Sequence, residues 1–160
     1  MGAKTGALAA QLEGKARDAV ATLQKLGDAD WKKVTAAEKW TVGVTAHHLA
    51  GGLEAVAGIV TGLVAGAPPR GNFTRAMLDQ MNAQHAVEHA DCTRAETLAL
   101  FQKGAATASA MLRGLSDDQL AKSGTVFTDV PPMTAEQLIN RGLLSHVDEH
   151  MGSIRTTVGM

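Results

Sequence analysis

Apolar residues recur at intervals of three and four along most of this chain, and this spacing restricts its fold more than any other feature. The spacing is typical of amphipathic helices, and no segment alternates apolar and polar residues as a half-buried strand does. Turn and capping residues divide the pattern into helical lengths. They predict helices over residues 5–25, 41–65, 73–92, 93–115 and 134–158.

Capping residues indicate where these helices begin. Thr41 is a good N-cap residue, and Thr93-Arg-Ala-Glu96 and Thr134-Ala-Glu-Gln137 match the capping-box pattern. A further box, Thr35-Ala-Ala-Glu38, predicts one short turn in the polar segment before the second helix.

Breaker residues separate the helices. Paired prolines and flanking glycines predict a loop over residues 66–72, and residues 116–133 should be mostly irregular. The chain has 160 residues, which suits one domain with one core. We therefore predict a single all-α domain over residues 1–160, built as a four-helix bundle with short extra helices.

Composition argues against several classes of partner. The 15 Lys and Arg nearly balance the 16 Asp and Glu, and there are only three Phe, two Trp and no Tyr, so a nucleic-acid partner is not expected. The most apolar stretch, residues 55–66, is shorter than the roughly 20 residues that span a bilayer. The first ten residues do not resemble a signal peptide, and the single Cys92 suits a reducing compartment. These features predict a cytoplasmic protein without a membrane partner.

Histidines are the residues that point to chemistry. The six of them form three pairs, His47 and His48, His85 and His89, and His146 and His150. The last two pairs have the i, i+4 spacing that places two imidazoles on one helix face, within reach of one metal ion.

The last pair lies on a stripe that should face the core. Its neighbours at three- and four-residue intervals are Ile139, Leu143 and Ile154. A buried imidazole without a partner costs about 1–3 kcal/mol, so His146 and His150 need either a metal ion or a structural partner such as a helix carbonyl or a buried carboxylate.

The second helix offers two neighbouring candidates for a third ligand. At about 100° per residue, His48 lies at the edge of the apolar stripe that contains Leu49 and Leu53. His47 lies farther round and should face solvent or a flanking helix. His48 is therefore the better inward ligand.

His85 and His89 are expected to be more exposed. The apolar face of their helix is predicted from Ala83, Ala86, Val87 and Ala90. His85 lies roughly opposite Ala83, which favours an exposed pair beside Glu88 over a His-His-Cys site with Cys92.

One short motif is set aside. His146-Val-Asp-Glu-His150 matches the H-x-x-E-H pattern of inverted zinc peptidases, with Glu149 as the general base. Those enzymes need a further ligand downstream, and none of the last ten residues is His, Cys, Asp or Glu. Glu149 should point beside the site or to solvent.

Two longer segments resemble the DinB-like superfamily. Trp40-Thr-Val-Gly-Val-Thr-Ala-His-His48-Leu-Ala is similar to its W-[ST]-x-x-x-x-x-x-H-L-A segment, and Leu144-Ser-His146-Val-Asp-Glu-His150-Met-Gly-Ser-Ile154 to its closing L-x-H-x-x-x-H-x-G-x-I segment. Asp79-Gln-Met-Asn82 resembles its D-x-x-N element, and Leu115-Ser-Asp-Asp-Gln-Leu120 its polar turn after the third bundle helix. The resemblance covers most of residues 5–158.

This resemblance implies a four-helix bundle of the DinB/YfiT-like type with a divalent metal near one end. The ligands that it implies are His48, His146 and His150, the three that periodicity selects separately. Relatives include thiol-dependent S-transferases and maleylpyruvate isomerases that use mycothiol or bacillithiol, and several mycothiol-type members have Glu at the position of His146. The resemblance also implies a homodimer.

Three imidazoles leave a zinc or nickel ion with an open position, as catalytic sites do. No protein nucleophile stands out, so the catalytic residues stay unassigned and a reacting thiol would come from a low-molecular-weight cofactor. Asn82 either orients that ligand or bridges two helices. Two functions follow, namely a metal-dependent thiol transferase or hydrolase for a small molecule, and a non-catalytic metal- or small-molecule-binding stress-response bundle.

The second helix also carries Gly58, Gly62 and Gly66 at four-residue intervals. This smooth strip is interpreted as tight packing within the monomer, with a homodimer contact as the alternative.

Overall fold

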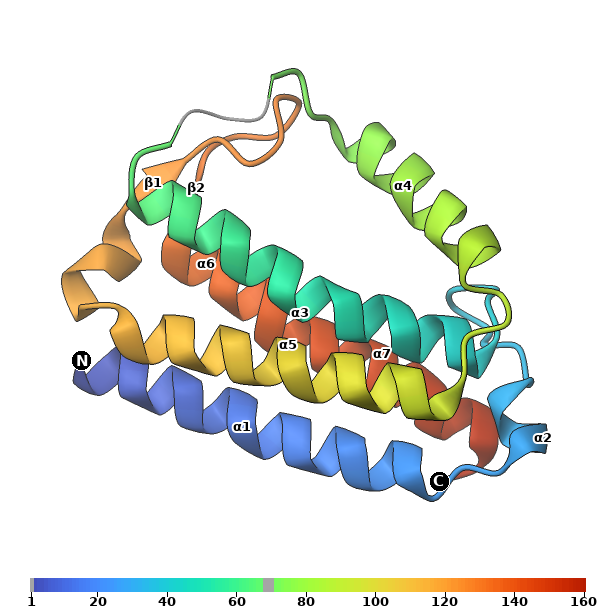
Figure 1. The fold of residues 1–160 in the computed structure, drawn as a ribbon. Coiled ribbons are helices and arrows are strands. Elements are labelled where there is room, and N and C mark those ends of the chain that lie inside the picture. Colours follow the sequence, from blue (N-terminus) through green and yellow to red (C-terminus); the bar gives the residue numbers. More distant parts are fainter. Residues whose placement is uncertain (1, 68–70) are drawn as a thin grey trace.

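Four long helices form the body of the protein. The computed structural model describes residues 2–67 and 71–160. The four are α1 (Ala3–Gln24), α3 (Val42–Val64), α5 (Arg94–Gly114) and a composite last helix of α6 (Ala135–Ile139), η2 (Asn140–Ser145) and α7 (His146–Val158). α3 packs against α5 and α7, and α1 also packs against α5 and α7 (Figure 1). The predicted all-α four-helix bundle is confirmed.

The core of the bundle comes from the apolar stripes of all four helices. Its fully buried side chains include Leu12, Leu49, Leu53, Phe101, Leu112, Ile139, Leu143 and Ile154. α3 and α5 approach closely at Gly104, where an added Cβ would lie 2.9 Å from the Ala50 carbonyl oxygen.

The capping residues place most helix ends within about two residues of their predicted positions. Thr41 is the N-cap of α3, and its hydroxyl accepts a hydrogen bond from the Val44 amide at 3.1 Å. The boxes at Thr93 and Thr134 cap α5 and α6 as predicted. The Thr35 box precedes one short turn, as predicted, since residues 36–38 form a turn.

Several short elements connect the long helices. α2 (Asp28–Trp31) lies in the polar segment before α3, and the 3-10 helix η1 (Asp117–Ala121) follows α5. The strands β1 (Ser123–Gly124) and β2 (Met133–Thr134) form an antiparallel pair. These elements refine the prediction of a mostly irregular segment over 116–133. The predicted loop over 66–72 is only partly described, since Pro68, Pro69 and Arg70 lie outside the described residues.

The last helix is not the regular α-helix predicted over 134–158. η2 is a π-helical segment, in which hydrogen bonds join residues five apart. Gly142 lies within it, and an added Cβ there would meet Val56 Cγ1 at 2.9 Å. The π segment therefore lies directly against α3, immediately before His146.

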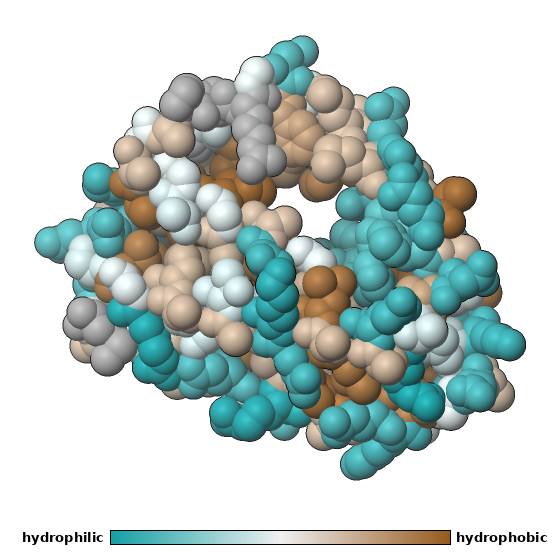
Figure 2. All heavy atoms as spheres, viewed as in Figure 1, coloured by the Kyte–Doolittle hydropathy of each residue, from teal (hydrophilic) through white to brown (hydrophobic). Residues whose placement is uncertain are grey.

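α4 (Arg75–Glu88) lies outside the bundle and is shorter than the helix predicted over 73–92 (Figure 1). None of its residues is buried. The predicted apolar face was wrong, because Ala83, Val87 and Ala90 are exposed, Val87 at 79%. An opening passes between α4 and the bundle in the space-filling view (Figure 2).

By length and composition alone, α3 is long and apolar enough to cross a membrane. The core helix of a bundle can have the same length and composition, so this feature is weak evidence for a membrane span; 33% of the apolar window is buried in the structure.

The glycine strip on α3 does not pack tightly within the monomer. An added Cβ at Gly58 would meet no atom within 4 Å, and one at Gly62 would make only an ordinary contact, 3.7 Å from Ala67 Cβ. The interpretation as an intramolecular packing surface was wrong, because this side of α3 faces away from α5 and α7.

Candidate metal centre

The contact between α3 and α7 brings His48, His146 and His150 together. One ring nitrogen of each residue lies within 4.8 Å of one from each of the other two. The ring centroids of His48 lie 5.3 Å from His146 and 5.0 Å from His150, and the centroids of His146 and His150 lie 4.4 Å apart. Two helices of a bundle thus place three imidazoles around one point, as their periodicity predicts.

Burial keeps the rings of His48 and His146 neutral. Desolvation, with His150 and His48 nearby, lowers the pKa of His146 to about 3. Desolvation also lowers the pKa of His48 to about 4, with His150 and His85 adding to the effect. A neutral imidazole is the form that binds a metal ion, because its unprotonated nitrogen keeps a free lone pair.

Glu38 fixes the orientation of His150. Nδ1 of His150 donates to Oε1 of Glu38 at 2.8 Å, since a carboxylate can only accept, and Ser153 Oγ donates to Oε2 at 2.6 Å. Burial opposes ionisation of Glu38, but hydrogen bonds from Ser153, Thr35 and His150 lower its pKa overall. With Nδ1 occupied, Nε2 of His150 is left for a metal, as in many carboxylate–histidine–metal arrangements.

The sequence patterns did not predict this role of Glu38. The pattern Thr35 to Glu38 indicated a capping box, but the Glu38 side chain turns to α7 instead. A signal was available: a ligand histidine usually needs a carboxylate or carbonyl behind it, and Glu38 is the acidic residue nearest in sequence to Trp40.

Two further α3-side residues limit how the rings can move. Trp40 packs edge-on against His48, with ring centroids 5.2 Å apart. Gly52 leaves room for His146, because an added Cβ would lie 3.2 Å from Nε2 of that ring. Trp40 lies just before α3, and Gly52 lies within it.

The donor set fits a divalent transition metal. Three neutral nitrogen ligands suit zinc or nickel and leave at least one coordination position free. Within the part of the chain that the structure describes, no further His, Cys, Asp or Glu joins this group. Glu149 is exposed, as predicted, and does not belong to it. All three rings are only partly buried, so a small molecule can approach.

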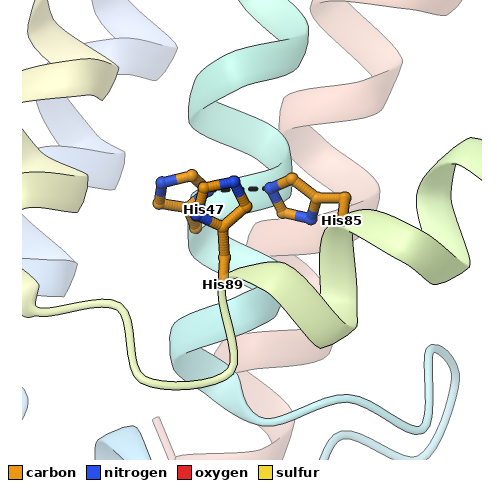
Figure 3. Close-up of side chains that lie close together, drawn as sticks. All are labelled: His47, His85 and His89. Atoms are coloured by element: carbon orange, nitrogen blue, oxygen red, sulfur yellow. Dashed lines mark hydrogen bonds between the residues drawn. The ribbon is translucent and has the colours of Figure 1, made fainter.

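A second histidine cluster lies beside the first. His47 of α3 meets His85 and His89, which come from the C-terminal end of α4 (Figure 3). The prediction that His47 faces solvent or a flanking helix is confirmed for the flanking helix α4. The prediction that His85 and His89 form an exposed pair was wrong: both are half-buried and turn toward α3, because α4 has no core for its alanine face to cover.

Cys92 and Asn82 occupy less central positions. Cys92 does not join the histidines of either group among the described residues, and burial raises the pKa of its thiol. Asn82 is half-buried on α4, three residues before His85, and so shares the face that His85 and His89 present to α3.

Comparison with known proteins identifies the family. The family described as the mycothiol maleylpyruvate isomerase N-terminal domain matches residues 12–144, most of the chain. The matched residues include His48, His85 and His89, and the match ends just before His146.

The fold is also found in a solved structure. The crystal structure of an uncharacterized protein from Clostridium difficile 630 superimposes with a TM-score of 0.76 at 13% identity, covering 96% of this chain and 94% of that chain. No curated protein matches the chain. The family match extends over most of the sequence and the shared bundle over nearly all of it, so the chain belongs to the mycothiol maleylpyruvate isomerase N-terminal domain family of the DinB-like superfamily.

Proposed function

We propose that this protein is a divalent-metal-dependent transferase that joins a low-molecular-weight thiol to a small electrophilic molecule. The observation that carries the proposal is the convergence of His48, His146 and His150 from two helices, with ring nitrogens within 4.8 Å of one another. Membership in a mycothiol-related, generally metal-dependent family supports the choice of a thiol over water.

The three histidines would hold the ion, and zinc or nickel suits their nitrogen donors. When bound, such an ion lowers the pKa of a coordinated thiol or water, which is the chemistry that thiol transfer and hydrolysis both require. In the transfer, a carbon–sulfur bond forms, and the thiol proton leaves with the displaced group or moves to the substrate.

The residues of the chain itself position the reactants. Glu38 holds the His150 ring through Nδ1, and Trp40 holds His48 by an edge-on contact. Asn82 faces the same side of the bundle from α4 and offers an amide that would hydrogen-bond to a thiol cofactor or substrate. The opening beside α4 is where we propose that small molecules enter (Figure 2).

His146 separates this chain from the mycothiol-type relatives that carry Glu at this position. A neutral imidazole in place of a carboxylate leaves one more positive charge at the loaded site, which favours an anionic thiolate. We therefore propose that a thiol cofactor is kept, and that its identity, mycothiol, bacillithiol or another small thiol, is what differs. The cytoplasm, where such thiols stay reduced, is the proposed location.

The test uses the purified chain without an affinity tag. Bound metal is measured, and conjugation of a model electrophile is followed with mycothiol, bacillithiol, glutathione and cysteine. We expect the wild type to turn over the electrophile with at least one thiol. His146→Ala should lose this turnover and one metal equivalent per chain. The matched surface variant Glu149→Ala should keep both. Asn82→Ala should raise KM for the thiol more than it lowers kcat.

Other outcomes would replace the proposal. Turnover of esters without a thiol would make the protein a hydrolase. A full metal complement with no turnover in either panel would make it a binding protein of the stress-response type. Unchanged turnover in His146→Ala would show that the three-histidine centre is not the active site.

A further inference from the structure

The second histidine cluster has the composition of a metal site in its own right. One ring nitrogen of each of His47, His85 and His89 lies within 4.8 Å of one from each of the other two. His85 and His89 are four residues apart on α4, and His47 approaches from α3 (Figure 3). An i, i+4 pair completed by one ligand from a neighbouring helix is a common way to hold a divalent ion.

The ring nitrogens of this cluster make few hydrogen bonds to one another. Nδ1 of His47 and Nε2 of His85 are 2.8 Å apart, which is the one hydrogen bond drawn among the three rings (Figure 3). Nδ1 of His85 is buried and has no hydrogen-bond partner. His89 stacks on His47, with ring centroids 4.1 Å apart, and makes no hydrogen bond to it. Imidazole nitrogens that crowd together without partners are better satisfied by a shared cation.

The chemistry of the rings permits a cation at this place. A neutral imidazole keeps one unprotonated nitrogen, whose lone pair can coordinate a divalent ion. Three such nitrogens lie within 4.8 Å of one another here.

The position of the cluster gives a bound ion a structural role. At its N-terminal end, α4 is tied to the 125–130 loop by the Arg75 amide, which donates to Asp129 Oδ1 at 3.1 Å, and by the stacked rings of Phe73 and Phe127. Its middle buries no residue. Its C-terminal end meets α3 through the histidines, so this cluster is where α4 is joined to the helix that carries His48.

We propose that His47, His85 and His89 bind a second divalent transition-metal ion, which clamps the C-terminal end of α4 onto α3. The two sites are neighbours: His47 and His48 are adjacent in sequence, and the rings of His48 and His85 have centroids 5.8 Å apart. The second site does not depend on the proposed transferase activity, because it is defined by its own three ligands.

Zinc titration of the metal-free, tag-free chain tests the stoichiometry. Equilibrium dialysis followed by elemental analysis should give two zinc ions per wild-type chain. His48→Ala should retain one ion and His89→Ala one ion, whereas the double variant should retain none. Gln80→Ala, a matched change on the exposed side of α4, should retain two.

Hydrogen exchange tests whether the zinc ion bound by His47, His85 and His89 is the one that holds α4 in place. Zinc should slow amide exchange in α4 by at least tenfold in the wild type and in His48→Ala, but not in His89→Ala. His89 is the C-cap residue of α4, so its removal should leave the fold intact. His85→Gln, which keeps a polar side chain of similar size, provides a second variant if His89→Ala proves unstable.

Three results would overturn the proposal: a single zinc ion per wild-type chain that His48→Ala removes, the wild-type zinc content in both His89→Ala and His85→Gln, or zinc-independent exchange of α4 in His48→Ala. If the second site fails while His48→Ala still removes one ion, the first metal centre stands. If His48→Ala removes none, the first centre fails and the second is judged by the α4 variants alone.

Discussion

Glu38 and His150 show how one hydrogen bond orients a metal ligand. Nδ1–H of His150 donates to the carboxylate, and Ser153 holds the other oxygen of that carboxylate. The ring is thus fixed in one tautomer with Nε2 free, before any ion arrives.

Loss of Glu38 should therefore weaken metal binding without removing a ligand. We expect Glu38→Ala to reduce zinc affinity by about 10–100-fold, the usual effect of deleting such a partner. Affinity would be measured with a chelating indicator in a His89→Ala background, so that the second cluster does not contribute. Glu149→Ala, an exposed glutamate on α7, is the control and should bind normally. Equal affinity in both variants would contradict the orienting role.

Gly52 should matter for a steric reason. A Cβ at this position would lie 3.2 Å from Nε2 of His146, tighter than about nine in ten real Cβ contacts, so the ring would have to shift by a few tenths of an ångström. Gly52→Ala should lower zinc affinity while leaving the melting temperature close to that of the wild type. Gly51→Ala is the matched control, because its Cβ would make an ordinary contact, 3.9 Å from Leu100. A similar affinity in the two variants would show that the His146 ring has room to move.

At the scale of helices, the success of prediction depended on where each helix packs. Capping boxes at Thr93 and Thr134 and the N-cap at Thr41 depend only on local hydrogen bonds, so they placed helix starts correctly. Periodicity distinguished His48 from His47 because one face of α3 is buried in the core, and its apolar stripe shows in the sequence. The same reasoning failed on α4, since a helix that buries no residue has no inward apolar stripe to detect.

The α3–α5 contact allows a paired test of glycine packing. Gly104→Ala would place a methyl group 2.9 Å from the Ala50 carbonyl oxygen, and overpacking of this kind costs about 1–3 kcal/mol. Gly58→Ala meets no atom within 4 Å and should stabilise the helix by about 0.5–1 kcal/mol. Denaturant unfolding would measure both. A stabilised Gly104→Ala would mean that α3 and α5 can move apart at little cost.

α1 is capped by a residue from another element. Asp117 of η1 accepts hydrogen bonds from the Thr5 amide at 3.0 Å and the Lys4 amide at 3.2 Å, where Gly2 offers no side chain. The backbone hydrogen bonds from Thr5 and Lys4 lower the pKa of Asp117 below 3.8, although burial opposes this.

A lowered carboxyl pKa stabilises the folded state above the unfolded pKa, and the contribution is lost as pH falls through the folded pKa. Asp117→Ala should therefore melt several degrees below the wild type at pH 6, and the difference should narrow as the pH falls below about 4. Thermal melts over pH 3–7 would test this, with the neighbouring Asp118→Ala as control. A constant difference across this range would assign the effect to packing rather than charge.

At the scale of the whole molecule, the bundle is robust to sequence change. The Clostridium difficile 630 protein shares the fold at 13% identity over nearly all of both chains. In this chain the bundle could be predicted from the spacing of apolar positions, which depends on residue class rather than on residue identity. The second histidine cluster was not predictable in this way, because it requires the position of α4 relative to α3.

The homodimer that the resemblance implies stays a prediction. Two surfaces of small or apolar residues are uncovered in the monomer, one at Gly58 on α3 and one at Met77 and Met81 on α4. Light scattering after gel filtration should give twice the 16.6 kDa of one chain. A mass of one chain at micromolar concentration would contradict it.

The π-helical segment ties the metal centre to the winding of the last helix. η2 accommodates about one residue more than an α-helix would over the same rotation, and it lies between the buried Ile139 and the pair His146 and His150. A regular α-helix with the same number of residues would rotate everything beyond η2 by about 100°. The two imidazoles would then turn away from His48, although every ligand would still be present. Deleting one residue as the helix becomes regular would cancel that rotation, so homologues that keep all three histidines and lack one residue in this segment should have a regular last helix and an intact centre.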